Sequence, residues 1–264
     1  MAKTTQWQTI KAGEGDRQVV TDHLVTEAPL EFLLSDTPLA VLMRTPGDDE
    51  DLILGFAITE GIVFGPDEVQ EVARVEGDPE NNRYQLILAA GVQVDPEQFR
   101  RSMFSSSSCG VCGKASIDAL RVAAPTPPSG PVVGQKRLLE LPHLMLSAQS
   151  TFHVTGGLHS AAIFTPGGEL LVIREDVGRH NAVDKVIGAL ARRRWPLGEL
   201  ILLVSGRISF EVVQKAAVAG IPMVCGVSAP TSLAVELADE LGLTVIGFLR
   251  DHGFNLYAGA QRLE

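Results

Sequence analysis

The sequence predicts an α/β protein, and three observations support this fold class. From residue 159 onward, short apolar runs typical of buried strands alternate with amphipathic segments typical of helices. Polar clusters stand where each strand would pass into the next helix. The chain has 264 residues, of which 45% are hydrophobic and 20% charged, so it has the composition of a globular protein with a sizeable core.

Charge and composition exclude several classes of protein. A formal net charge of −10 and the lack of an extended basic tract argue against a nucleic-acid partner. Residues 1–22 are polar and no stretch of 18 uncharged apolar residues occurs, so we expect no membrane insertion and a cytoplasmic location. Three cysteines, an odd number, do not make a disulfide framework. A small anionic ligand stays compatible, because a few cations gathered in one cleft can outweigh a diffuse acidic surface.

The first part of the chain reads as a smaller α+β portion. Strand-like runs at Glu31–Leu34 and Leu39–Met43 flank the turn residues 35–38 and predict a hairpin. A helix should then begin at Asp48 or Asp49 and end at Gly61. Its apolar stripe consists of Leu52, Ile53, Phe56 and Ala57. A strand and a short helix should follow, at Tyr84–Ala89 and from Asp95 to about Met103.

Four prolines between Ala123 and Pro131 predict a linker, because proline can continue neither a helix nor a central strand. We therefore expect an N-terminal portion at 1–123, a linker at 124–134 and an α/β domain at 135–264. A helix should cover Leu138–Ser150. Expected strands are Ala161–Thr165, Leu170–Arg174, Leu200–Val204, Met223–Val227 and Thr244–Leu249, arranged as parallel units with helices at Asn181–Arg194, Phe210–Gly220 and Ser232–Leu241.

Three polar clusters, at residues 175–181, 205–207 and 228–232, each follow a predicted strand and open the next helix. In a parallel sheet all strand C-termini lie on one edge, where α/β folds bind their ligands. Helix N-termini together with Arg179 and Arg207 would suit phosphate or pyrophosphate. Each cluster alone is explained better as a capped helix start. The three together favour an anion pocket, and among the histidines only His180 is expected at this edge.

Cys109 and Cys112 form a CxxC loop before a helical stretch at 115–122, so the helix dipole and Lys114 should favour the thiolate form. A structural zinc site would need further ligands, and the chain offers only Cys225 and scattered histidines. A zinc deaminase would need an H-x-E or C-x-E motif, which is absent. A thioredoxin-like pair would follow a strand directly. Cys225 lies in an apolar run and reads as a small buried hydrophobic residue.

Four motifs in this order resemble the FdhD family of formate dehydrogenase accessory sulfurtransferases. They are Ser-Cys-Gly-Val-Cys-Gly at 108–113, Glu-Asp-Val-Gly-Arg-His-Asn-Ala-Val-Asp-Lys-Val at 175–186, Ser-Gly-Arg-Ile-Ser at 205–209 and Ser-Ala-Pro-Thr at 228–231. The resemblance implies a cytidine-deaminase-like mixed sheet flanked by helices, without catalytic zinc, in a protein that is usually a homodimer. It also implies sulfur transfer from a cysteine desulfurase to the molybdenum bis(molybdopterin guanine dinucleotide) cofactor, which then enters formate dehydrogenase.

The same resemblance assigns roles to residues. Cys109 would carry the persulfide, and Cys112 would assist or resolve it. A Gly-Phe-x-Arg segment matches residues 247–250, although Asp251 stands where the family often has glycine. The cofactor, or GDP as its mimic, would contact Arg179, His180, Arg207, Ser228, Phe248, Leu249, Arg250, Asp251, His252 and Gly253, with Asp184 as a weaker candidate. A zinc-dependent base hydrolase and a non-catalytic cofactor chaperone are the alternatives.

Overall fold

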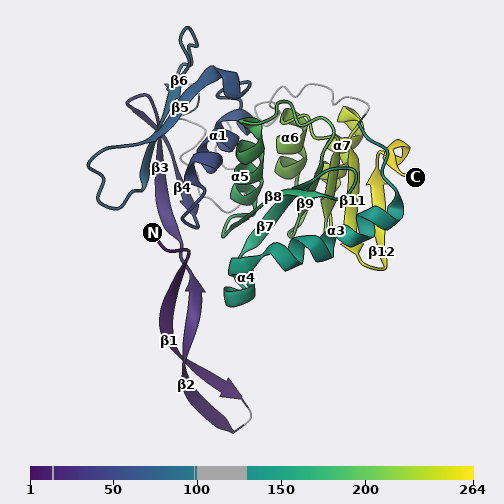
Figure 1. The fold of residues 1–264 in the computed structure, drawn as a ribbon, viewed down its shortest axis with the longest axis horizontal. Helices are drawn as coiled ribbons and strands as arrows, with labels where there is room; N and C mark the ends of the chain where they lie inside the picture. The colour runs from purple at the N-terminus through teal and green to yellow at the C-terminus, as the bar shows by residue number, and fades with distance from the viewer. Residues whose placement is uncertain (14, 98, 100–129) are drawn as a thin grey trace.

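The structure is a computed structural model, and it describes residues 1–13, 15–97, 99 and 130–264. Within these residues the chain forms a two-stranded arm, a four-stranded sheet with one helix, and a six-stranded sheet with helices on both faces (Figure 1). The predicted α/β class is confirmed. Parts of the short helix expected at Asp95–Met103 and most of the linker expected at 124–134 lie outside the described residues, and the domain boundaries stay a prediction.

A two-stranded arm at the N-terminus extends away from the body of the molecule (Figure 1). It consists of β1 (Thr4–Gly13) and β2 (Asp16–Val25), paired antiparallel from Thr4 opposite Val25 to Gly13 opposite Asp16. Trp7, Ile10 and Val19 are more than half exposed. The polar reading of residues 1–22 missed this arm, because β-branched and polar residues are mixed there without the alternation that marks a half-buried strand.

The four-stranded sheet has the order β4-β3-β6-β5. Its strands are β3 (Ala28–Leu34), β4 (Thr37–Arg44), β5 (Val69–Arg74) and β6 (Arg83–Leu88). Leu34 pairs with Thr37 across a tight turn, so the predicted hairpin is confirmed. Helix α1 (Asp49–Thr59) covers this sheet, and Ile53 of the helix packs with Phe32 and Leu86 in one fully buried cluster.

The six-stranded sheet has the order β12-β11-β10-β9-β7-β8. Its strands are β7 (His159–Phe164), β8 (Leu170–Asp176), β9 (Ile201–Val204), β10 (Met223–Gly226), β11 (Thr244–Arg250) and β12 (Gly253–Ala258). Strands β9, β10 and β11 are parallel, as expected. Strand β12, which no pattern in the sequence indicated, runs antiparallel to β11.

The expectation of parallel pairing was wrong for β7, which runs antiparallel to both of its neighbours, β8 and β9. The reason is the short connection between β7 and β8, where Thr165 and Glu169 are joined by a main-chain hydrogen bond of 2.9 Å. Such a tight turn can only form a hairpin, since a parallel connection needs a long crossover. Strand β8 nevertheless points in the same direction as β9, β10 and β11, because two reversals separate it from β9.

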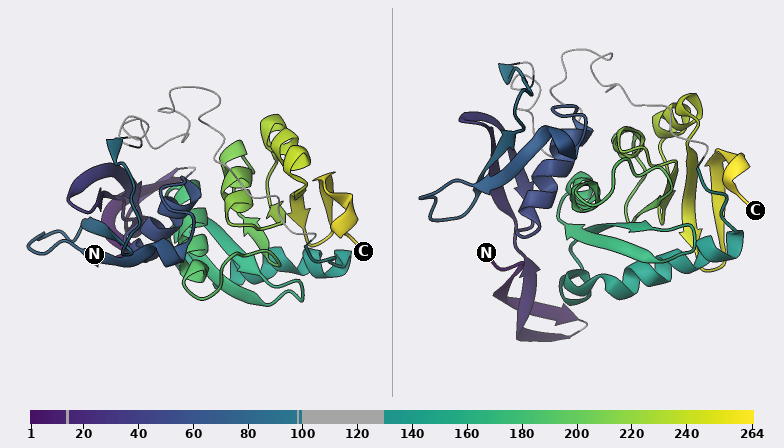
Figure 2. Two further views of the ribbon diagram at one scale, coloured as in Figure 1. Left: turned by 90° about the horizontal axis from the view of Figure 1, so that it is seen from above. Right: turned by 45° about the horizontal axis from the view of Figure 1, so that its top comes forward.

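Helices cover both faces of the six-stranded sheet (Figure 2). Helices α5 (Arg179–Ala191), α6 (Phe210–Val218) and α7 (Ser232–Leu241) bury one face, where Ile163 and Leu202 lie. Helix α3 (Gln135–Ala148), followed by α4 (Ser150–Thr155), packs on the other face against Phe164 and Leu203. Neighbouring strand residues thus alternate between two cores. Among the helices in the described ranges, none has the length and apolar character needed to cross a bilayer.

Helices α1 and α5 touch through their backbones, and this contact joins the two sheets. A Cβ atom at Gly55 would overlap the main-chain oxygen of Asp184. Likewise, a Cβ atom at Gly188 would overlap the main-chain oxygen of Asp51. Glycine is therefore required on both sides of the crossing, because no side chain can turn away from a backbone atom that meets its own Cβ.

We expect Gly188→Ala to lower the free energy of unfolding by roughly 3 kcal/mol, because the added methyl group forces two helices apart rather than filling a void. Urea denaturation followed by circular dichroism measures this change. Gly13→Ala is the matched control, since its Cβ would meet no atom within 4 Å. Equal midpoints for the two variants would contradict the tight crossing.

Candidate functional site

The C-terminal ends of β8, β9, β10 and β11 meet on one side of the six-stranded sheet, which we call the convergent edge (residues 176–181, 205–209, 228–231 and 247–248). Main-chain hydrogen bonds tie its segments together. Ile208 N donates to Ala229 O at 3.1 Å, and Phe248 N donates to Ser228 O at 3.1 Å. The first segment joins them through side chains, since His180 Nε2 lies 3.2 Å from Ser209 Oγ. The three polar clusters therefore lie close together, as strand direction predicted.

The helices that start at the convergent edge differ in how their N-termini are capped. Thr231 caps α7, because its Oγ1 accepts a hydrogen bond from Ala234 N at 3.3 Å. The N-cap residues of α5 and α6 are Gly178 and Ser209, and neither makes a side-chain capping bond. Capping thus explains only the third cluster. The first turns of α5 and α6 keep N–H groups that can serve an anionic ligand.

Arg179 and His180 lie at the start of α5 and contact each other at the convergent edge. Arg179 Nε is 3.2 Å from His180 Nε2, which also lies 2.9 Å from Glu211 Oε2 and 3.2 Å from Ser209 Oγ. Arg207, from the loop after β9, is exposed. Ser209 and Glu211 were missed in the sequence, although they stand only two and four residues after the polar cluster that ends at Arg207.

His159 also lies at the convergent edge, so the expectation that only His180 would do so was wrong. Strand β7 runs against its neighbours, and its first residue therefore lies where theirs end. A Cβ atom on Gly206 would be 3.5 Å from His159 Nδ1 and 3.9 Å from Arg179 Cβ. Burial lowers the pKa of His159, and the nearby charges of Arg179 and His180 lower it further. A bound anion would oppose these two charges and raise that pKa.

The turn that leads from β8 into α5 is organised by Asp176, whose side chain is fully buried. Asp176 Oδ1 accepts hydrogen bonds from Gly178 N at 2.8 Å and from Asn181 Nδ2 at 2.9 Å. Its Oδ2 accepts from Thr45 N at 3.1 Å and lies 2.7 Å from Lys185 Nζ. Four donors on one carboxylate offset the cost of burying its charge and fix the path of the chain toward Arg179.

Asp184 lies in α5, and its side chain is buried against α1 and α6. It does not face the convergent edge, so its suggested role in cofactor binding was wrong. Its carboxylate lies 2.9 Å from Lys215 Nζ and accepts a hydrogen bond from Thr59 Oγ1 at 2.7 Å. Lys215 also pairs with Glu60 at 3.0 Å. Burial alone would lower the pKa of Lys215, but the two carboxylates outweigh it and raise that pKa above its ordinary value. In the motif at 175–186, the polar residues around Arg179 and His180 thus form buried ion pairs and hydrogen bonds and do not contact a ligand.

The C-terminal segment is divided between the site and the core. Leu249 is fully buried among core residues, so its side chain does not reach the surface, and its place in the predicted cofactor-binding segment stays a prediction for its main chain. Phe248 is 44% exposed and has a φ of 52°, a left-handed conformation that is rare for an aromatic residue. A bulge in the pairing of β11 with β12 accompanies it. The backbone thereby turns one aromatic ring outward beside Ser228, while its neighbour stays in the core.

Arg250, Asp251, His252 and Gly253 form the tip of the hairpin that joins β11 to β12. Asp251 and His252 are more than four-fifths exposed, and their side chains are 2.7 Å apart. The hydrogen bond from His252 lowers the pKa of Asp251. Arg250 donates to the main-chain oxygen of Leu249 at 3.1 Å and is otherwise exposed. The tip follows the end of β11, so its exposed side chains lie on the same side of the sheet as the convergent edge.

Cys109 and Cys112 lie outside the described residues. Cys225 lies in β10 and is fully buried, as its apolar surroundings predicted. Burial raises the pKa of its thiol to about 12, so this cysteine is neutral at physiological pH. Where the structure describes the chain, no group of three or more His, Cys, Asp or Glu side chains gathers to hold a metal ion.

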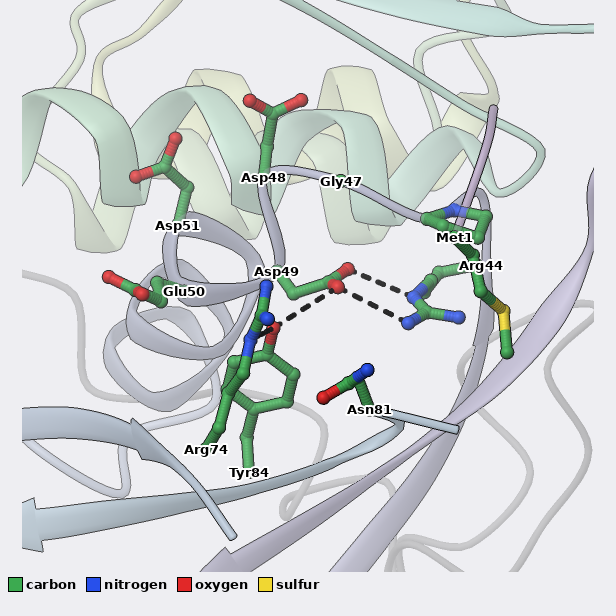
Figure 3. A pocket seen from close by; sticks show the side chains of 11 residues that line it. Met1, Arg44, Gly47, Asp48, Asp49, Glu50, Asp51, Arg74, Asn81 and Tyr84 are labelled. Atoms are coloured by element: carbon green, nitrogen blue, oxygen red, sulfur yellow. Dashed lines mark hydrogen bonds and ion pairs between the residues drawn. The ribbon is translucent and has the colours of Figure 1, made fainter. Parts of the chain in front are cut away.

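A separate pocket lies at the start of α1 (Figure 3). Its lining includes four consecutive acidic residues, 48–51, together with Arg44, Arg74 and Tyr84. Arg44 is almost fully buried and binds Asp49 through two hydrogen bonds of 2.9 and 3.2 Å. Of the predicted site residues that the structure describes, none lines this pocket. Its carboxylates would repel phosphate groups, so the convergent edge remains the better site for an anion.

The fold and the edge define a class: a mixed α/β protein in which two arginines and two helix N-termini without side-chain caps converge where the strands end. Such an arrangement has the donors and positive charges that a phosphorylated ligand would need. The chain belongs to the FdhD/NarQ family, whose sequence model matches residues 25–264.

Relatives and one solved structure agree with this assignment. Proteins named sulfur carrier protein FdhD are 47% identical in Streptomyces coelicolor, over 98% of this chain and 95% of the relative, and 46% identical in Mycobacterium tuberculosis, over 93% and 94%. One from Sulfolobus acidocaldarius is 41% identical over 96% of both chains. A structure from Desulfotalea psychrophila, described as a formate dehydrogenase accessory protein, covers 100% of both chains with a TM-score of 0.80 and 22% identity, which supports the fold.

We expect Cys225 to be inert toward thiol reagents in the folded protein. With a pKa of about 12 and a fully buried side chain, Cys225 has a thiolate fraction on the order of 10⁻⁵ at pH 7. A variant with Cys109→Ala and Cys112→Ala should release no colour from Ellman's reagent until denaturant is added, and then react at one thiol per chain. Rapid reaction under native conditions would show that Cys225 is accessible.

Proposed function

We propose that this protein is a cytoplasmic sulfur carrier that accepts sulfur from a cysteine desulfurase on Cys109 and delivers it to the molybdenum bis(molybdopterin guanine dinucleotide) cofactor. The cofactor is its substrate, and the sulfurated product is destined for formate dehydrogenase. The names of relatives more than 40% identical support the sulfur-carrier role. The accessory role toward formate dehydrogenase is supported by the resemblance of the motifs and by the description of the structural neighbour.

The observation that carries the proposal is the convergence of Arg179, Arg207 and the N-termini of α5 and α6 on one edge. The dinucleotide arms of the cofactor carry pyrophosphates, which match two guanidinium groups and helix N–H donors. The exposed ring of Phe248 stands next to Ser228 at the same edge and offers a flat apolar surface to a guanine base. Phosphate and base recognition would thus come from adjacent segments.

The sulfur step follows from thiolate chemistry. The Cys109 thiolate attacks the outer sulfur of the desulfurase persulfide, the sulfur–sulfur bond of that persulfide breaks, and the desulfurase thiolate leaves. Cys109 then carries the persulfide, and no net oxidation has occurred. Attack of Cys112 on the Cys109 sulfur would release the outer sulfur as hydrosulfide and leave a disulfide between the two cysteines. The two cysteines then remain oxidised as a disulfide until a dithiol reductant restores both thiols.

The proposed partners are the desulfurase, formate dehydrogenase and a second copy of the chain. A homodimer is expected from the resemblance of the motifs alone. Neither nucleic acid nor a membrane has a role in the proposal, in keeping with the net charge of −10.

We expect Arg207→Ala to weaken GDP binding by about 10- to 100-fold, the loss that corresponds to one or two charge-assisted hydrogen bonds. Isothermal titration calorimetry with the full-length protein measures the affinity. Arg207 is exposed and holds no part of the core, so the variant should keep the melting temperature of the wild type.

The control for this experiment is Arg193→Ala. It removes an equally exposed arginine just beyond the C-terminal end of α5, far along the helix from the convergent edge. The net charge of the two variants is the same, so a general electrostatic effect would weaken both. Equal affinities for GDP would remove Arg207 from the site.

Incubation with a cysteine desulfurase and cysteine should add one sulfur atom to the wild type but none to Cys109→Ala, because Cys109 is the proposed acceptor thiolate and Cys112 acts only after Cys109 is loaded. Intact-protein mass spectrometry reads this directly. Cys225→Ala is the control and should be labelled like the wild type, because Cys225 is buried. Labelling of Cys109→Ala at the wild-type level would disprove the assigned acceptor, whereas GDP binding without labelling of any form would indicate a chaperone.

A further inference from the structure

The turn that carries Arg179 and His180 is held from outside its own sheet. Thr45 directly follows β4, in the four-stranded sheet, yet it contacts the turn between β8 and α5. It is 1% exposed. No motif in the sequence pointed to this residue, because its partners are more than 130 residues away along the chain.

All three polar groups of Thr45 bond to the turn or to α5. Its N–H donates to Asp176 Oδ2 at 3.1 Å, and its hydroxyl oxygen accepts from Val177 N at 3.2 Å. Its carbonyl oxygen accepts from Lys185 Nζ at 2.9 Å. Two residues earlier, Met43 O accepts from Asn181 Nδ2 at 2.8 Å. The end of β4 therefore makes hydrogen bonds to residues that come before and after the Arg179–His180 pair in the chain.

The hydroxyl contact differs from the others in what it controls. Asp176 is held by four donors, so it keeps its place if one bond is lost. Among the described contacts, Val177 N has the Thr45 hydroxyl as its hydrogen-bond acceptor. Val177 lies two residues before Arg179, immediately ahead of the Gly178 N-cap. Loss of this bond leaves the N–H of the Asp176–Val177 peptide without that acceptor, directly before the Gly178 N-cap from which α5 starts.

We propose that Thr45 is a positioning residue for the anion site, which it serves by fixing the Asp176–Val177 peptide and thereby the direction of Arg179, His180 and the first N–H groups of α5. The inference rests on the proposed function, since it takes the convergent edge to be the place where a pyrophosphate binds. It also means that the four-stranded sheet contributes to ligand affinity without touching the ligand.

The test compares Thr45→Val, Thr45→Ser and Thr59→Val in the full-length protein. Valine keeps the shape of threonine and removes only the hydroxyl, whereas serine keeps the hydroxyl. Thr59 is the matched control, because it is equally buried and its hydroxyl also bonds to α5, at Asp184, but on the side away from the convergent edge. GDP affinity is measured by calorimetry, and melting temperature is measured on the same samples.

We expect Thr45→Val to bind GDP about tenfold more weakly, the equivalent of one hydrogen bond. Thr45→Ser should restore the wild-type affinity. Thr59→Val should lose at least as much thermal stability as Thr45→Val and still bind GDP normally, which a general loss of stability could not produce. If Thr59→Val does not fold, the valine and serine variants at position 45 still decide the question.

Unchanged GDP affinity in Thr45→Val would overturn the positioning role while leaving the proposed function intact. An equal loss of affinity in folded Thr45→Val and Thr59→Val would also overturn it, since stability alone would then explain both. Failure of the wild type to bind GDP would instead count against the proposed ligand. GDP binding by the variants therefore tests the role of Thr45, and GDP binding by the wild type tests the proposed ligand.

Discussion

The backbone contact between α1 and α5 is the constraint on which the rest of the molecule depends. Each helix belongs to a different sheet, and the contact at Gly55 and Gly188 leaves no space for a Cβ atom on either side. With the two helices in contact, Asp184 of α5 accepts a hydrogen bond from Thr59 of α1 and forms a buried ion pair with Lys215 of α6. Removing one partner of such a group costs several kcal/mol, so the three helices can hardly separate without unfolding.

This fixed crossing explains how a residue of one sheet can serve the edge of the other. Because α1 starts a few residues after β4, holding α1 against α5 also holds the end of β4 against the turn before α5. Thr45 can then bond Asp176, Val177 and Lys185 at once. The position of Arg179 thus depends on the packing of α1 against α5, which does not itself contact a ligand at the convergent edge.

Sequence patterns predicted most strands and helices after residue 28, because apolar periodicity reports burial directly. They also predicted the convergence of three clusters, since this follows from strand direction. Direction failed at β7, where a short turn made a hairpin and brought His159 to the edge. Asp184 was misassigned because a motif shows which residues occur together and does not show which way each side chain points. Thr45 could not be found, since its role depends on contacts distant in sequence.

The division of side chains also explains how an acidic chain can hold an anion. Asp176 and Asp184 stand close to the arginines in sequence, yet both carboxylates point inward, where Lys185, Lys215 and main-chain N–H groups neutralise them. Glu211 remains near the convergent edge, but it pairs with His180, and Asp251 at the adjacent hairpin tip pairs with His252. Since interactions between exposed charges weaken within about 10 Å in physiological salt, the remaining acidic groups on distant surfaces matter little there. Arg179 and Arg207 then set the local potential, whatever the net charge of the whole chain.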